Sequence, residues 1–172
     1  MNALLRQIDL PRAALLVIAA GFATIAGAWA YEHFGYAPCD LCLKQRWAYY
    51  AGLPLAAVAL VAYLRGARGL AATLLALVAA MFAANAIFAF YHSGVEAKLW
   101  PGPAGCTGGF NPPASLEDFR NQLKTVHVVR CDEAALRVLG LSLANWNVLI
   151  SGALAIVACV GVRQPPDRSV AT

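Results

Sequence analysis

The stretch LAATLLALVAAMFAANAIFAFY runs over residues 70–91 without one charged side chain. A helix needs about 20 consecutive apolar residues to cross the hydrocarbon layer of a bilayer. Because no water is present there to bind backbone N–H and C=O groups, a crossing segment satisfies them itself by becoming a helix. The stretch therefore predicts a membrane-spanning helix.

Three further stretches share this character, and they cover residues 13–30, 47–64 and 143–162. Hydrophobic residues make up 60% of the 172-residue chain and charged residues only 13%, whereas a soluble domain carries about 25% charged residues. A chain of this length fits one domain. We therefore predict an all-α fold, an integral membrane four-helix bundle that residues 1–172 form as a single membrane domain.

The distribution of charge predicts the orientation of the bundle. The short segments before the first span, between the second and third, and after the fourth carry six basic and two acidic residues, whereas residues 92–142 carry five of each. By the positive-inside rule, both termini are cytoplasmic, and the loops at residues 31–46 and 92–142 face the other side. The net charge of +4 thus marks topology, and we expect no nucleic-acid partner. The six basic residues are Arg6, Arg12, Arg65, Arg68, Arg163 and Arg168.

Four of the five cysteines lie in the two outer loops. Cys39 and Cys42 precede the second span, and Cys106 and Cys131 lie in the long loop before the fourth. Disulfides persist outside the cytoplasm, so these four cysteines predict two disulfides. Three pairings are possible, and proximity in sequence favours Cys39–Cys42 and Cys106–Cys131. We expect the fifth cysteine, Cys159 in the fourth span, to be a buried and inert thiol.

The spacing of Cys39 and Cys42 favours a redox role over a structural one. A disulfide across only two intervening residues removes little chain entropy and so stabilises little. At the start of a helix, the helix dipole and the free N–H groups also favour a thiolate. The pair therefore predicts an exchange-competent dithiol, whereas a Cys106–Cys131 disulfide fits a structural role equally well.

Arg46 follows Cys42 by four residues, so we expect both on one face of the second span. The positive-inside rule predicts few basic residues on this outer side, which favours a task beyond interfacial snorkelling. A guanidinium here can stabilise the Cys42 thiolate and bind a carbonyl oxygen of an electron acceptor in the bilayer. Quinones are such acceptors, and a fixed cation would stabilise the negative charge that develops as they are reduced.

The run CDLCLKQR at residues 39–46 resembles the CxxCxxxR signature of the DsbB disulfide bond formation proteins. Three more motifs add to the likeness: YHSGVE at 91–96, GPAGC at 102–106 and SLANWN at 142–147. Four spans and a second cysteine pair before the last span follow the same order. The resemblance therefore extends from about residue 12 to residue 162.

This resemblance implies a protein-thiol:quinone oxidoreductase of the bacterial inner membrane. Cys106 would be attacked by the thiolate of a periplasmic DsbA-like thioredoxin-fold partner, and the released Cys131 would attack Cys39. Cys42 would then pass the electrons to a membrane quinone, either ubiquinone or menaquinone. The residues that would bind the quinone are Arg46 and His92.

A short amphipathic helix is expected in the second periplasmic loop. Residues 115–125 begin with the capping-box pattern SLED. Leu116, Phe119 and Leu123 then recur on one face, which fits a helix lying on the outer membrane surface. Such docking would keep Cys131 near Cys39.

Other interpretations explain part of the pattern. His33, Cys39, Cys42 and His92 could supply the ligands of a zinc site, but a cationic Arg46 beside a cationic metal is unfavourable, so we expect no metal. The chain could instead be a non-catalytic membrane assembly factor with two structural disulfides. Vitamin K epoxide reductase-like proteins perform related chemistry, but their membrane-proximal CxxC lies near the last core helix, whereas here it follows the first span.

Overall fold

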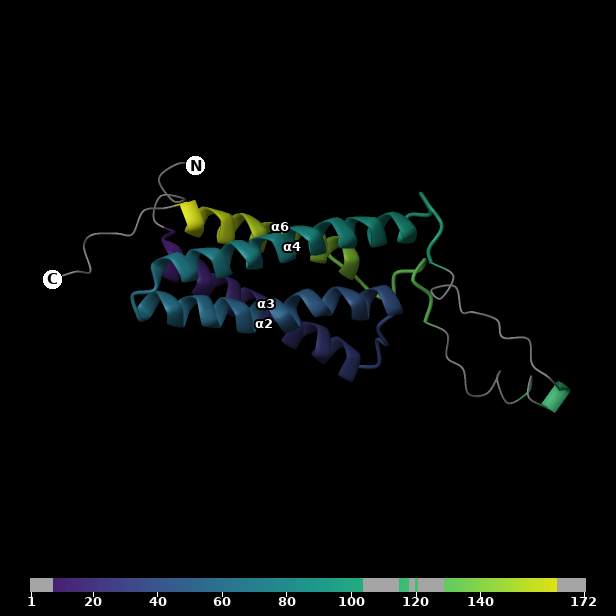
Figure 1. Ribbon diagram of the computed structural model, residues 1–172. Coiled ribbons are helices and arrows are strands. Elements are labelled where there is room, and N and C mark those ends of the chain that lie inside the picture. Colours follow the sequence, from purple (N-terminus) through teal and green to yellow (C-terminus); the bar gives the residue numbers. More distant parts are fainter. Residues whose placement is uncertain (1–7, 104–114, 118–119, 121–128, 164–172) are drawn as a thin grey trace.

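The four predicted spans are four long helices in the computed structural model (Figure 1), which describes residues 8–103, 115–117, 120 and 129–163. All four are long and apolar enough to cross a membrane. The predicted all-α membrane bundle is therefore confirmed. In chain order the helices are α2 (Leu10–His33), α3 (Asp40–Leu64), α4 (Arg68–Glu96) and α6 (Leu143–Arg163).

Successive helices run antiparallel, so their connections gather at two opposite ends of the bundle (Figure 1). One end holds the start of α2, the turn between α3 and α4, and the end of α6. The other end holds the loop from α2 to α3, the end of α4 and a small hairpin, in which β1 (Arg137–Val138) pairs antiparallel with β2 (Leu141–Ser142). The described cysteines of the two predicted outer loops therefore lie at one end.

Three helices extend beyond the predicted spans at this end. α2 ends at His33 rather than at residue 30. α3 begins at Asp40 rather than at residue 47, and α4 continues to Glu96 rather than ending at residue 91. The predicted bounds followed the charge-free stretches, whereas a helix keeps its hydrogen bonds past the hydrocarbon layer and into the polar interface. These extra turns matter because they carry Cys42 and His92, two of the predicted site residues.

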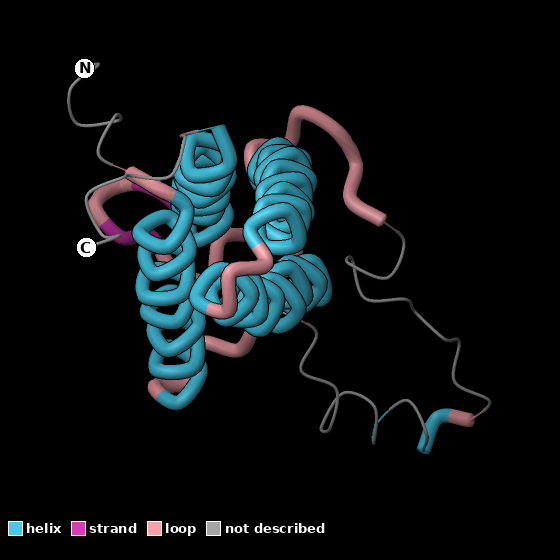
Figure 2. Tube along the Cα trace, turned by 60° about the vertical axis from the view of Figure 1, so that its left-hand side comes forward, coloured by secondary structure: helices cyan, strands magenta, loops and turns pink. Residues whose placement is uncertain are grey.

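The four helices lie side by side in one bundle (Figure 2), and small residues let some of them approach closely. A Cβ added at Gly52 of α3 would lie 3.1 Å from the ring of Phe82 of α4. Gly161 of α6 likewise lies directly against Ala13 of α2. Such close approach of small residues is typical of helices that associate in lipid. Large apolar side chains instead cover the outside of the bundle, among them Phe22, Trp47, Ile87, Phe90, Leu149 and Ile156.

Cys159 contradicts its prediction, because its side chain is exposed on the outside of α6 rather than buried. The preceding residue, Ala158, is the one that faces the core, with no exposed surface. In a membrane span, positions that face lipid and positions that face other helices are both apolar. The apolar neighbours of Cys159 in sequence therefore could not tell the two sides of the helix apart.

Candidate active site

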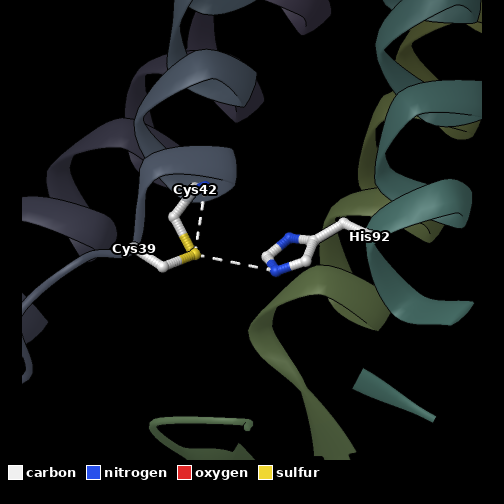
Figure 3. A group of neighbouring side chains, drawn as sticks. All are labelled: Cys39, Cys42 and His92. Atoms are coloured by element: carbon white, nitrogen blue, oxygen red, sulfur yellow. Dashed lines mark hydrogen bonds between the residues drawn. The ribbon is translucent and has the colours of Figure 1, made fainter. Parts of the chain in front are cut away.

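The dithiol occupies the first turn of α3. Cys39 is the N-cap residue, and its sulfur accepts a hydrogen bond from the backbone N–H of Cys42 at 3.2 Å. Both cysteines are free thiols, and their sulfur atoms lie 2.7 Å apart. Figure 3 shows the two side chains together at the start of the helix. A disulfide can therefore form and open here with little movement of the backbone.

His92 reaches the dithiol from the end of α4 (Figure 3). Its side chain is only 1% exposed, and its Nε2 atom lies 3.6 Å from the sulfur of Cys39. The same Nε2 atom lies 3.9 Å from Oε1 of Glu96, one turn further along α4. The other oxygen of Glu96, Oε2, is buried and has no hydrogen-bond partner among the described residues. The predicted site residue His92 thus lies directly beside the thiols.

The surroundings of Cys39 favour its thiolate. Its sulfur interacts first with the thiol of Cys42, then with His92 and the Cys42 backbone, and these hydrogen bonds lower the pKa of Cys39 to about 5 although burial opposes the shift. From the sequence, we expected Arg46 to stabilise a thiolate on Cys42. The hydrogen bonds converge on Cys39 instead because an N-cap side chain faces the free N–H groups of the first helical turn.

Arg46 forms an ion pair with Glu32 at the end of α2, with 2.7 Å between Nη1 and Oε2. The side chain of Arg46 is 12% exposed, so the pair is partly shielded from solvent. The sequence pattern did not single out Glu32, because this contact depends on how the ends of α2 and α3 lie together. The ion pair fixes the guanidinium in place beside the dithiol end of α3.

A cavity of about 330 Å³ lies between α2, α3 and α6. Its wall is mostly apolar, and both Cys42 and Arg46 line it, whereas Cys39 and His92 do not. Its volume falls within the range of small-molecule sites, about 300–1,000 Å³. Cys42 is therefore the sulfur that a ligand in this cavity would meet. The other polar or aromatic side chains of the wall are Thr24, Tyr31, Tyr36, Gln45, Tyr49, Trp146 and Asn147.

Cys131 lies in a small buried cluster with Cys39 and Leu41, and Cys42 packs against the same cluster. Cys131 is disulfide-bonded and has no exposed surface. Its predicted partner, Cys106, lies outside the described residues, as does most of the predicted amphipathic helix at residues 115–125. The pairing and that helix therefore stay predictions, whereas the position of Cys131 against Cys39 is a finding.

An ion pair joins the segment around Cys131 to the residues that follow α4. Asp132 binds Arg130 at 2.8 Å and Lys98, just beyond α4, at 2.7 Å. These hydrogen bonds, from Arg130 foremost and then from Lys98, hold the pKa of Asp132 well below its usual range. The carboxylate therefore stays ionised, and the segment that carries Cys131 remains tied to the end of α4.

A row of buried polar side chains continues from His92 into the bundle. Nε2 of Gln45 lies 2.9 Å from Nδ1 of His92, and Oε1 of Gln45 accepts a hydrogen bond from Nδ2 of Asn147 at 2.6 Å. Oδ1 of Asn147 accepts a hydrogen bond from the Ser151 hydroxyl at 3.0 Å. Polar residues inside a membrane bundle are costly and often functional, so their occurrence within the apolar spans was a signal in the sequence. The full row is His92, Gln45, Asn147, Tyr49, Ser151 and Asn85.

The zinc hypothesis is met only in part. Ligand atoms of Cys39, Cys42 and His92 all lie within 4.8 Å of one another. His33 does not join this group; it ends α2, where its ring packs edge-on against Phe34. The structure therefore brings together three of the four residues considered as ligands.

These features define a class of protein: a membrane-spanning four-helix bundle with two adjacent thiols at one end and a further, disulfide-bonded cysteine packed against them. Residues 11–161 match the family described as "Disulfide bond formation protein DsbB". The chain belongs to this family, whose members are oxidoreductases of disulfide bond formation. The resemblance that the motifs indicated is thereby confirmed.

One relative is itself without an assigned activity. The uncharacterized protein RP370 of Rickettsia prowazekii (strain Madrid E) is 26% identical over 145 residues, which cover 83% of this chain and 81% of the relative. No solved structure matches the chain. The likeness to RP370 thus extends over most of both chains and adds no substrate or cofactor.

Proposed function

We propose that this protein is a protein-thiol:quinone oxidoreductase that reoxidises a periplasmic DsbA-like partner and reduces a membrane quinone. One observation carries the proposal: Cys131 packs against Cys39, while Cys42 lines a separate, mostly apolar cavity. Cys42 also packs against the cluster of Cys39 and Cys131, but only Cys42 of the two lines the cavity. One can exchange with the second cysteine pair, and the other can meet a lipid-soluble acceptor.

Electrons pass from the partner to the dithiol by successive disulfide exchanges. A thiolate of the reduced partner attacks Cys106, and the sulfur of Cys131 departs with the electron pair. The Cys131 thiolate attacks Cys39 in the Cys39–Cys42 disulfide, and Cys42 departs as a thiolate. The second thiol of the partner displaces Cys106, whose thiolate then displaces Cys39 from Cys131. The partner and the Cys106–Cys131 pair end oxidised, and the dithiol ends reduced.

The residues of the cavity fit a quinone as the terminal substrate. A quinone accepts two electrons and two protons, which are what the Cys39–Cys42 dithiol loses when it closes into a disulfide. The apolar wall suits the ring, and the Arg46 guanidinium, fixed by Glu32, can bind a carbonyl oxygen. His92 acts on the other sulfur of the dithiol, because its Nε2 atom faces Cys39.

The orientation in the membrane follows from charge. The end of the bundle that carries Arg12, Arg65, Arg68 and Arg163 is assigned to the cytoplasm. The dithiol end then faces the periplasm, where a thioredoxin-fold partner can reach the loop of residues 92–142. We therefore propose that the protein lies in the bacterial inner membrane with both termini in the cytoplasm.

The proposal is tested with the purified full chain, a reduced DsbA-like protein and a water-soluble ubiquinone or menaquinone analogue. We expect quinone reduction at the rate at which partner disulfides appear, and loss of both in Cys42→Ser and in Cys106→Ser. Cys159→Ser is the matched control, because Cys159 lies on the outside of α6, and it should keep full activity. Undiminished turnover in Cys42→Ser would refute the relay. Metal analysis of the same preparation separates the relay from the zinc alternative.

A further inference from the structure

The hydrogen bonds of the buried polar row run in one direction, from donor to acceptor. That direction is set by the end of the row that meets the dithiol. A thiolate only accepts hydrogen bonds, so the nitrogen of His92 that faces Cys39 must carry a proton to bond with it. That nitrogen is Nε2, at 3.6 Å. The Glu96 carboxyl oxygen 3.9 Å from Nε2 is a second acceptor on the same side. A neutral imidazole with its proton on Nε2 then presents Nδ1 as an acceptor.

Gln45 and Asn147 supply the donor that Nδ1 of His92 then needs. The amide nitrogen of Gln45 donates to Nδ1 of His92, and the amide oxygen of Gln45 accepts from Asn147. The oxygen of Asn147 in turn accepts from the hydroxyl of Ser151. Each donor thus points toward the dithiol. Turning either amide alone would set two donors or two acceptors face to face, which is costly for buried groups.

We propose that Gln45 and Asn147 are positioning residues that hold His92 with its proton on Nε2, so that the imidazole donates to the Cys39 thiolate. This inference rests on the proposed function of the dithiol as the exchanging pair. All three side chains are buried, so water does not readily replace a lost partner. A sulfur that is stabilised as a thiolate is also a better leaving group, and Cys39 leaves when the Cys106 thiolate attacks its bond to Cys131.

The test is the tautomer of His92, measured by ¹⁵N NMR on the reduced full chain, labelled at histidine and held in detergent micelles. Signals of His92 are assigned by their loss in His92→Phe. We expect the proton on Nε2 in the wild-type chain and a mixture of tautomers in Gln45→Leu and Asn147→Leu. In Gln45→Glu, the carboxylate can only accept, so the proton should move to Nδ1. This last variant keeps the shape of the side chain and decides the outcome if the leucine variants do not fold.

Asn85→Leu is the matched control. Asn85 is a buried amide of the same row, but among the described residues it donates to Ser151 at the far end. We expect the Nε2 tautomer to persist in this variant. A wild-type proton on Nδ1, or an equal response of Asn85→Leu and Gln45→Leu, would overturn the proposal.

A second readout follows the reactivity of the sulfur. Mass spectrometry of the Cys39 peptide gives its rate of alkylation by iodoacetamide at a fixed, mildly acidic pH. The rate should fall about fivefold in Gln45→Leu and Asn147→Leu, as expected for the loss of one hydrogen bond to the thiolate, and stay unchanged in Asn85→Leu. Neither readout uses quinone or partner. A failure of quinone reduction therefore leaves this inference standing, and a failure here leaves the relay standing.

Discussion

Cys131 and Cys39 share one buried cluster, although the whole of α3 and α4 lies between them in the chain. Removing Cys42 and Cys106 together takes away the partner proposed for each of these two sulfurs. We predict that Cys42→Ser with Cys106→Ser forms a Cys39–Cys131 disulfide under mild oxidation, detected by mass spectrometry of unreduced peptides. The matched variant, Cys39→Ser with Cys106→Ser, should cross-link Cys42 to Cys131 far less. Equal cross-linking of the two would count against a relay that enters at Cys39.

Removal of His92 should make Cys39 less reactive in weakly acidic solution. The pKa of Cys39 is lowered to about 5, in part by His92, so the wild-type thiolate is present above that pH and is lost as the pH falls through it. In His92→Phe, the midpoint should move upward, toward the ordinary value for a thiol. The pH profile of Cys39 alkylation measures it. His33→Phe, which changes a histidine at the end of α2, should leave the profile in place.

Arg46→Ala should weaken quinone binding. The guanidinium lines the cavity and is held by Glu32, and a hydrogen bond from a charged donor contributes about 1.5–3 kcal/mol. We therefore expect the KM for the quinone analogue to rise by at least about tenfold. Lys44→Ala is the control, because its ion pair with Asp40 is exposed on both sides and should contribute little. An equal change of KM in both variants would show that Arg46 has no specific role in binding the quinone.

Gly94→Ala should destabilise the dithiol end of the bundle. A Cβ at Gly94 would collide with the ring of Trp100, whose Nε1 donates to the backbone oxygen of Tyr91. Overpacking of this kind costs about 1–3 kcal/mol, so the Tm measured in detergent should fall. At Gly152 of α6, an added Cβ meets no atom within 4 Å, and alanine is the better helix former. Gly152→Ala should therefore leave Tm unchanged or raise it.

The length and the low polarity of the apolar stretches were enough to predict most of the fold. The four charge-free stretches each became one helix, because a segment in lipid has few other ways to satisfy its backbone. The same stretches could not tell which side of a helix faces the core, and Cys159 was assigned wrongly for that reason. The helices are also longer than these stretches, since α3 and α4 continue past them to the turns where Cys42 and His92 lie.

Those parts of the site whose residues are close in the sequence could be predicted. Contacts between residues of different helices could not. The spacing of Cys39 and Cys42 indicated a helix-capping dithiol directly. The contact of Arg46 with Glu32 joins α2 to α3, and the contact of Gln45 with Asn147 joins α3 to α6. Neither contact has a sequence spacing to reveal it, because each depends on how two helices are placed side by side.

The separation of the two sulfurs also bears on the order of events during turnover. Since only Cys42 of the two lines the cavity, whereas Cys39 is buried with Cys131, the proposed partner and the proposed quinone would not compete for the same volume. An inhibitor lodged in the cavity should therefore stop turnover without blocking capture of the partner, and the stalled enzyme should accumulate as a covalent complex with it.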